Sequence, residues 1–96
     1  IVINQNVIIG KNCNVSQGVT LGNVSRGKFK GCPTIGDRVW IGANAVVVGK
    51  ISIGNDVLIA PLSYVNFDIP DNAVVMGNPA KIVNYNTSAE YIKNIN

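Results

Sequence analysis

A six-residue period runs through most of this chain and restricts the folds that it can adopt. Aliphatic residues recur at every sixth position, first as Ile3, Ile9, Val15 and Leu21, and later as Ile35, Ile41, Val47, Ile53, Ile59 and Val65. An α-helix cannot place these side chains on one face, because six residues advance the chain by well over one turn. Short strands separated by a bend at every sixth residue can do so. A fixed internal period of this kind indicates stacked, nearly identical units.

The period also predicts which side chains stack in the core. Three six-residue sides make one triangular coil, so side chains eighteen positions apart lie over one another. The predicted inner columns are Ile3, Leu21, Val47 and Val65; Ile9, Ile35 and Ile53; and Val15, Ile41 and Ile59. Glycine at the second place of many units is interpreted as a residue that tolerates the bend. The alternative is an antiparallel sandwich, whose strands show two-residue alternation and variable spacing between turns.

The organisation of the chain follows from where the period holds. Between Leu21 and Ile35 the step is fourteen residues, which predicts an extruded loop at 23–33. The period then continues to residue 70, and Asp71 interrupts it. We therefore expect one β-helical domain at 1–83 and a tail at 84–96. The tail contains a capping-box pattern at 87–90, which predicts a short helix to about residue 95.

Composition restricts the class of protein further. Ninety-six residues permit one domain, and no apolar run is long enough to span a membrane. The chain does not begin with Met and its first residue falls within the pattern, so we expect an N-terminal part to be absent. Cys13 takes an inward position and Cys32 lies in the loop, a placement that disfavours a disulfide between them. Two reduced thiols fit a cytoplasmic location.

Several stretches outside the bare repeat also match a known pattern, and they lie at residues 1–3, 17–22, 33–35, 41–45, 68–70 and 77–83. The last of these reads Gly-Asn-Pro-Ala-Lys-Ile-Val. Together they resemble the hexapeptide-repeat acyltransferases, and the serine acetyltransferase branch in particular, along residues 1–83. The resemblance implies an all-β fold, a left-handed parallel β-helix of hexapeptide repeats.

The resemblance also implies an acyl donor and an assembly. In this family acetyl-CoA lies in the groove between two prisms of a homotrimer, over backbone at small corner residues, with Lys or Arg near its phosphates. The matching positions here are Gly22, Asn23, Gly42, Ala43, Ala60, Pro61 and Lys81. Small side chains let a ligand approach main-chain amides, whereas Pro61 lacks that donor. Stacked outward residues, Trp40 over Leu58 and Val46 over Tyr64, predict a ligand groove or a subunit contact.

No catalytic residue is predicted within the chain itself. Acetyl transfer needs a general base, most often His, and this sequence contains none. The family pattern places its catalytic His a few residues before the position of Ile1. The predicted substrate-loop residues are Gln17, Gly31 and Cys32, and the last two stand where serine acetyltransferases have Arg-His. Without the guanidinium, the acceptor hydroxyl belongs to a sugar or another small molecule at least as readily as to serine.

Other classes of function fit the sequence less well than acetyl transfer does. Without His the chain offers no zinc site, and we expect no metal. Arg26, Lys28 and Lys30 cluster in the loop, but no aromatic platform accompanies them, so we do not expect a nucleic-acid binder. Cys32 is either a nucleophile activated by a neighbouring lysine or a plain loop cysteine. A catalytically inactive trimeric β-helix scaffold is the alternative from another functional class.

Overall fold

The computed structural model describes residues 1–27 and 30–85, and every regular element in these residues is a β-strand. The strands are β1 (Val2–Ile3), β2 (Ile8–Ile9), β3 (Asn14–Val15), β4 (Thr20–Gly22), β5 (Thr34–Ile35), β6 (Trp40–Ile41), β7 (Val46–Val48), β8 (Ser52–Ile53), β9 (Leu58–Ile59), β10 (Tyr64–Val65), β11 (Val74–Gly77) and β12 (Ala80–Asn84). The helix predicted at 87–95 lies outside the described residues.

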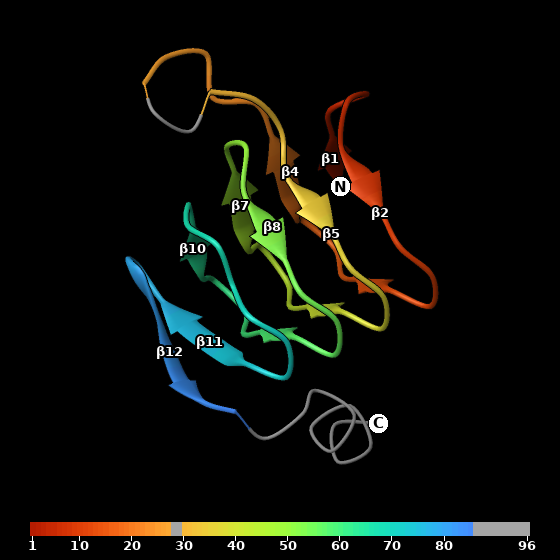
Figure 1. The fold of residues 1–96 in the computed structure, drawn as a ribbon, viewed down its shortest axis with the longest axis vertical. Helices are drawn as coiled ribbons and strands as arrows, with labels where there is room; N and C mark the ends of the chain where they lie inside the picture. The colour runs from red at the N-terminus through yellow and green to blue at the C-terminus, as the bar shows by residue number, and fades with distance from the viewer. Residues whose placement is uncertain (28–29, 86–96) are drawn as a thin grey trace.

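The strands form a three-sided prism, wound as a left-handed parallel β-helix (Figure 1). Sheet A has the order β1-β4-β7-β10, sheet B the order β2-β5-β8, and sheet C the order β12-β11-β9-β6-β3. All neighbouring strands are parallel except β11 and β12, which form an antiparallel pair. The predicted fold is therefore confirmed, and an antiparallel sandwich is excluded.

Bends at the corners depend on one conformation that recurs in the repeat. The fourth residue of a unit adopts a positive φ of 56–64° at Asn12, Arg38, Asn44, Asp56, Leu62 and Asn72. Asn and Asp tolerate this left-handed region better than other residues with side chains, which explains why they predominate here. Leu62 is the apolar exception.

Three corners join the sheets, and each has its own chemistry. The Asx corner joins sheets B and C at residues 10–13, 36–39, 54–57 and 70–73. The small-residue corner joins sheets C and A at residues 16–19, 42–45 and 60–63. The loop corner joins sheets A and B at residues 4–7, 22–27, 30–33, 48–51 and 66–68.

The three inner columns are paired as the period predicts. Leu21 pairs with Ile3 and with Val47, which in turn pairs with Val65. The other columns run from Ile9 through Ile35 to Ile53, and from Val15 through Ile41 to Ile59. Residues of these columns from the second coil onward are almost fully buried, so the prism core is a stack of aliphatic side chains.

The repeat continues beyond residue 70, contrary to the sequence-based expectation. Ile69 forms a bridge with Ile53, sixteen residues earlier rather than eighteen, so the last coil is two residues shorter. Ala73 and Val75 then take the corner and inner positions and are fully buried. Asp71 does not break the repeat.

Asp71 instead ends a ladder of side-chain caps along the Asx corner. Its Oδ1 accepts a hydrogen bond from Asn55 N at 2.7 Å, and Asn55 Oδ1 accepts one from Asp37 N at 2.7 Å. Asp37 Oδ1 in turn accepts from Lys11 N at 2.8 Å. Each coil thus satisfies a backbone amide of the preceding coil, which is the reason for Asp and Asn at this place.

Glycine at the second place of the unit has a different role from the one expected. Gly42 and Gly54 have no positive φ. They are needed because the coils stack closely: a Cβ on Gly42 would lie 2.5 Å from Pro61 N, and one on Gly54 would lie 2.7 Å from Asp71 N. Backbone contacts of that kind cannot be relieved by turning a side chain.

Gly22 and Gly42 therefore differ in their tolerance of alanine. Gly42→Ala is expected to lower the free energy of unfolding by about 1–3 kcal/mol, the usual cost of forcing a methyl group into packed structure. Gly22→Ala is the matched control, because its Cβ would meet only side-chain atoms at ordinary contact distances, Val48 Cγ1 at 3.4 Å and Thr20 Cγ2 at 3.8 Å. Chemical denaturation of both variants tests this, and equal loss in both would contradict it.

Candidate functional site at two corners of the prism

The predicted site residues fall at two corners, separated by sheet A. Gln17, Gly42, Ala43, Ala60 and Pro61 lie together at the small-residue corner. Gly22, Asn23, Gly31 and Cys32 lie at the loop corner. The structure thus brings each of these two groups together but does not join them into one cluster within a single chain.

Residues of the small-residue corner stack directly on one another. Gln17, Ala43 and Pro61 occupy the same place in three successive coils. Asn44 N donates to the carbonyl of Gln17 at 3.0 Å, and Leu62 N donates to the carbonyl of Ala43 at 3.0 Å. Side chains shrink from Gln17 to Ala43, and both Ala43 and Ala60 are partly exposed.

Backbone amides are open at this corner, in contrast to the Asx corner. Within residues 1–27 and 30–85, the N–H of Ala43 donates to no acceptor, and neither does that of Gln17. The Asx corner caps the amides at the equivalent place with Asp37, Asn55 and Asp71. Ala43 and Pro61 carry no side-chain oxygen, so they cannot cap the coil before them. An exposed ligand carbonyl could accept these hydrogen bonds.

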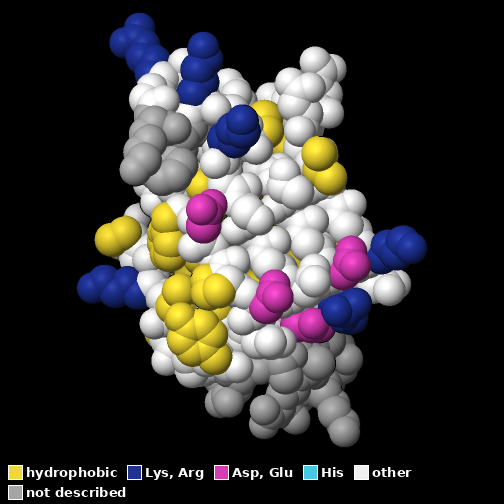
Figure 2. Space-filling view, viewed as in Figure 1, with side chains coloured by type: hydrophobic (Ala, Val, Ile, Leu, Met, Phe, Trp, Pro, Cys, Tyr) yellow, Lys and Arg dark blue, Asp and Glu magenta, His cyan; other side chains and the backbone are white. Residues whose placement is uncertain are grey.

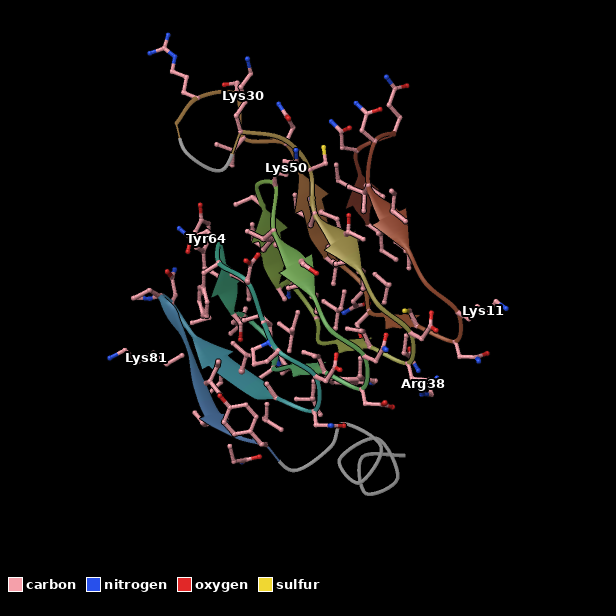
Figure 3. The ribbon with its side chains drawn as sticks, in the orientation of Figure 1. Lys11, Lys30, Arg38, Lys50, Tyr64 and Lys81 are labelled. Carbon is pink, nitrogen blue, oxygen red and sulfur yellow. The ribbon has the colours of Figure 1, made fainter. Side chains whose placement is uncertain are left out.

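Lys81 lies at the C-terminal end of the same corner. It pairs with Met76 across the antiparallel strands β11 and β12. Met76 follows Val75, which accepts a hydrogen bond from Ala60 N at 2.9 Å. The exposed Lys81 ammonium is thus the cation at the end of the small-residue column, on the same side of the prism as Tyr64 (Figure 3).

The loop corner carries the second group of residues. Val24 and Gly31 form an antiparallel bridge with N–O distances of 3.0 and 2.9 Å, which closes the base of the extruded loop. Next to this bridge, the Cys32 thiol makes a weak contact with Asn23 Oδ1 at 3.9 Å. Cys13 and Cys32 are both free thiols.

Apolar side chains are exposed near the C-terminal end of the prism. Figure 2 shows hydrophobic side chains gathered on the side of β10, β11 and β12. Leu62 is 70% exposed and Tyr64 is 37% exposed, and Met76 is exposed beside them in the chain's last coil. Leu62 also holds the positive φ that Asn or Asp adopts elsewhere, so an apolar residue is kept in an unfavourable conformation on the surface.

One of the two predicted outward columns is not a free surface. Trp40 pairs with Leu58 and Val46 pairs with Tyr64, as predicted. Leu58, however, is only 4% exposed, and its neighbour Val74 is 1% exposed. The Trp40 column is therefore buried from Leu58 onward, whereas the Val46 column ends on the exposed Tyr64.

Sequence reasoning missed Lys50 and Leu62. Lys50 packs on Gly31: a Cβ on Gly31 would lie 3.0 Å from Lys50 Cβ. Gly31 lies in the extruded loop, outside the six-residue repeat, so the period cannot predict which residue packs against it. For Leu62 a signal existed, since it is the apolar residue at a place otherwise taken by Asn, Asp or Arg.

An ion pair between Arg38 and Asp56 lies away from both groups of predicted site residues. At the Asx corner, Arg38 Nε donates to Asp56 Oδ1 at 2.8 Å, and Arg38 Nη2 donates to Oδ2 at 3.0 Å. These hydrogen bonds hold the pKa of Asp56 below its usual value and raise the pKa of Arg38. The pair is partly exposed and lies at the Asx corner, away from the two groups of site residues.

The described part of the chain lacks two further features, a metal-binding cluster and a membrane-spanning helix. It holds no cluster of three His, Cys, Asp or Glu residues that could bind a metal ion. Residues 1–27 and 30–85 also contain no helix of the length and apolarity that a membrane crossing requires.

The chain is similar to known transferases. A family model described as bacterial transferase hexapeptide (six repeats) matches residues 32–66. The chain is 39% identical over 83 residues to a serine acetyltransferase of Synechococcus elongatus. The matched region is 86% of this chain and 34% of that protein. It is 40% identical over 82 residues to a protein of Escherichia coli K12 named colanic acid biosynthesis acetyltransferase WcaB, covering 85% of this chain and 50% of that protein.

The fold is also similar to that of a solved acetyltransferase structure. A serine acetyltransferase from Brucella abortus strain S19 in complex with coenzyme A superimposes with a TM-score of 0.84 at 32% identity, covering 90% of this chain and 34% of that chain. The present chain spans between a quarter and a half of the length of the curated relatives it matches.

Proposed function

We propose that this chain, which is similar to hexapeptide-repeat transferases, forms the β-helical part of an acetyl-CoA-dependent O-acetyltransferase. The observation that carries the proposal is the open Ala43 amide, which lies among small side chains at a corner without Asx caps. Pantetheine contains amide carbonyls that can accept such hydrogen bonds. The similar structure from Brucella abortus contains coenzyme A, which supports the choice of donor.

In the proposed reaction each part of the site has a stated role. The pantetheine arm lies along the small-residue corner, with its carbonyls on the amides of Gln17 and Ala43 and the CoA phosphates near Lys81. The acceptor oxygen attacks the thioester carbonyl, the C–S bond breaks, and the CoA thiol leaves with a proton. A general base takes the proton from the acceptor hydroxyl. This sequence contains no His, so we propose that a residue outside it provides the base.

A homotrimer fits this arrangement. The two groups of site residues lie at different corners of one prism, so a second prism beside sheet A would bring its loop corner against the first prism's small-residue corner. The exposed Leu62 and Tyr64 provide apolar surface for such a contact.

The acceptor is proposed to be a sugar hydroxyl rather than L-serine. Gly31 has a φ of 133°, and Lys50 occupies the space beside its Cα. An arginine at this position, which would bind a carboxylate, would be strained in this loop conformation. The similarity to a protein named for colanic acid biosynthesis also supports a sugar acceptor.

We expect the full-length protein to acetylate sugar acceptors and to use L-serine on the order of a hundredfold less efficiently than a serine acetyltransferase does. The reason is that losing an arginine–carboxylate contact costs about 2–3 kcal/mol. Release of the CoA thiol during turnover with each acceptor measures this. Efficient conversion of serine would contradict the acceptor, and binding of acetyl-CoA without transfer to any acceptor would favour an inactive scaffold.

A further inference from the structure

The loop corner carries an unassigned cationic side chain at the place where the acceptor is expected. Lys50 lies beside Gly31: a Cβ on Gly31 would lie 3.0, 3.5 and 3.6 Å from Lys50 Cβ, Cγ and Cδ. The aliphatic stem of Lys50 therefore runs along Gly31, and Gly31 leaves room for it by having no side chain. This packing places the stem of Lys50 against the loop base, which the bridge between Val24 and Gly31 closes.

Positive charge accumulates at this corner. Arg26, Lys30 and Lys50 are all exposed, and Lys30 precedes Gly31 in the chain. Figure 3 shows Lys30 and Lys50 at the same end of the prism, far from Lys11 and Arg38. Within residues 1–27 and 30–85, Lys50 forms no ion pair.

Most of the negative charge lies at another corner. Asp37, Asp56 and Asp71 occupy the Asx corner, and each accepts hydrogen bonds there. Asp68 lies at the loop corner one coil after Lys50, where its Oδ1 accepts a hydrogen bond from Ser52 N at 2.8 Å. Figure 2 shows basic side chains gathered at the loop end and others on both lower sides of the prism. Among the described residues of the loop corner, the cations Arg26, Lys30 and Lys50 outnumber the carboxylate of Asp68, which favours a ligand with net negative charge.

We propose that Lys50, supported by Lys30, binds an anionic group on the acceptor, and hence that the acceptor is an acidic sugar bearing a carboxylate or a phosphate. This inference rests on the proposed function, because it assigns the substrate class of the same site. The lysine takes over the charge that an arginine at position 31 would supply, but as a point charge without the bidentate fork. A free amino acid carries an ammonium group beside its carboxylate, so the same cations attract it less than they attract an acid with net negative charge.

The test compares acceptors that share the glucose ring and carry either an anion or a free hydroxyl group at C6. Methyl glucuronide and glucose 6-phosphate are the anionic probes, and methyl glucoside is the neutral one. For the full-length protein we measure kcat/KM for acetyl transfer from acetyl-CoA, and separately the affinity for each sugar by NMR titration without acetyl-CoA. We expect a preference of roughly tenfold or more for an anionic sugar, the size that one charge-assisted hydrogen bond provides, and a decrease of this preference in high salt. The better of the two anionic probes distinguishes carboxylate from phosphate.

Lys50→Met is the decisive variant, because it keeps the stem that packs on Gly31 and removes the ammonium. We expect it to abolish the preference for an anionic sugar while the affinity for methyl glucoside stays unchanged. Lys50→Arg should retain the preference. Lys11→Met, at the Asx corner, is the matched control and should behave as the unaltered protein does.

The outcomes separate the two proposals. Acetylation of charged and neutral sugars at equal rates, or a preference that Lys50→Met leaves intact, overturns the inference but not the proposed function. A binding preference that Lys50→Met abolishes, without acetyl transfer, supports the inference and counts against the proposed function. Weakened acetyl-CoA binding in Lys50→Met with unchanged sugar preference assigns the lysine to the donor and overturns the inference.

Discussion

Ile53→Asp is expected to prevent the chain from folding. Ile53 is 2% exposed and pairs with Ile35 on one side and Ile69 on the other, so a carboxylate at this place would lie in an aliphatic column with no partner. Burying an unpaired charged or polar group costs several kcal/mol, which is comparable with the total stability of a small domain.

Circular dichroism and thermal unfolding of the purified variant measure this effect. Thr34→Asp is the matched control, since Thr34 lies on the exposed outer side of the same sheet. We expect the control to change the free energy of unfolding by less than about 1 kcal/mol. A soluble Ile53→Asp protein with an unchanged melting temperature would show that this side chain does not point into the core.

Ala43→Trp is expected to abolish acetyl-CoA binding without unfolding the protein. Ala43 lies on the outer side of the small-residue corner, between Gln17 and Pro61, and its amide is open. An indole ring there would cover the amide and fill the path proposed for the pantetheine arm, but it would not enter the aliphatic core. The expected loss of affinity is at least a hundredfold, since both the hydrogen bond and the contact surface are lost.

Titration calorimetry with acetyl-CoA provides the measurement for the full-length protein, and sedimentation reports whether the proposed trimer is intact. Lys11→Trp places the same ring at the equivalent position of the Asx corner, where the backbone amide of Lys11 donates to Asp37 and its carbonyl accepts from Arg38 N. This control should bind acetyl-CoA normally. Unchanged affinity in Ala43→Trp would place the donor on another surface of the prism.

The positions of the site residues depend partly on features that a linear pattern does not contain. The resemblance selects both groups of residues, but it gives no reason why Ala43 differs from Asn55 at the equivalent place. The structure supplies that reason, because the amide of Asn55 is capped by Asp71 of the next coil, whereas Ala43 is followed there by Pro61. The catalytic base, the trimer and the acceptor stay predictions that the described residues do not test.

The sequence by itself determined the period of the fold, and with it the inner columns from Ile3 to Val65 and the place of the extruded loop, because each side chain eighteen residues further along meets the same environment. Only the tertiary structure decided what happens where this count fails. In the stretch from Val65 to Ile69, Phe67 is apolar as well, so hydrophobicity alone cannot show that the last coil is two residues shorter. The contact of Lys50 with Gly31 likewise depends on the tertiary structure, because Gly31 lies in the loop between Leu21 and Ile35. In that loop the six-residue period does not determine which residues contact each other.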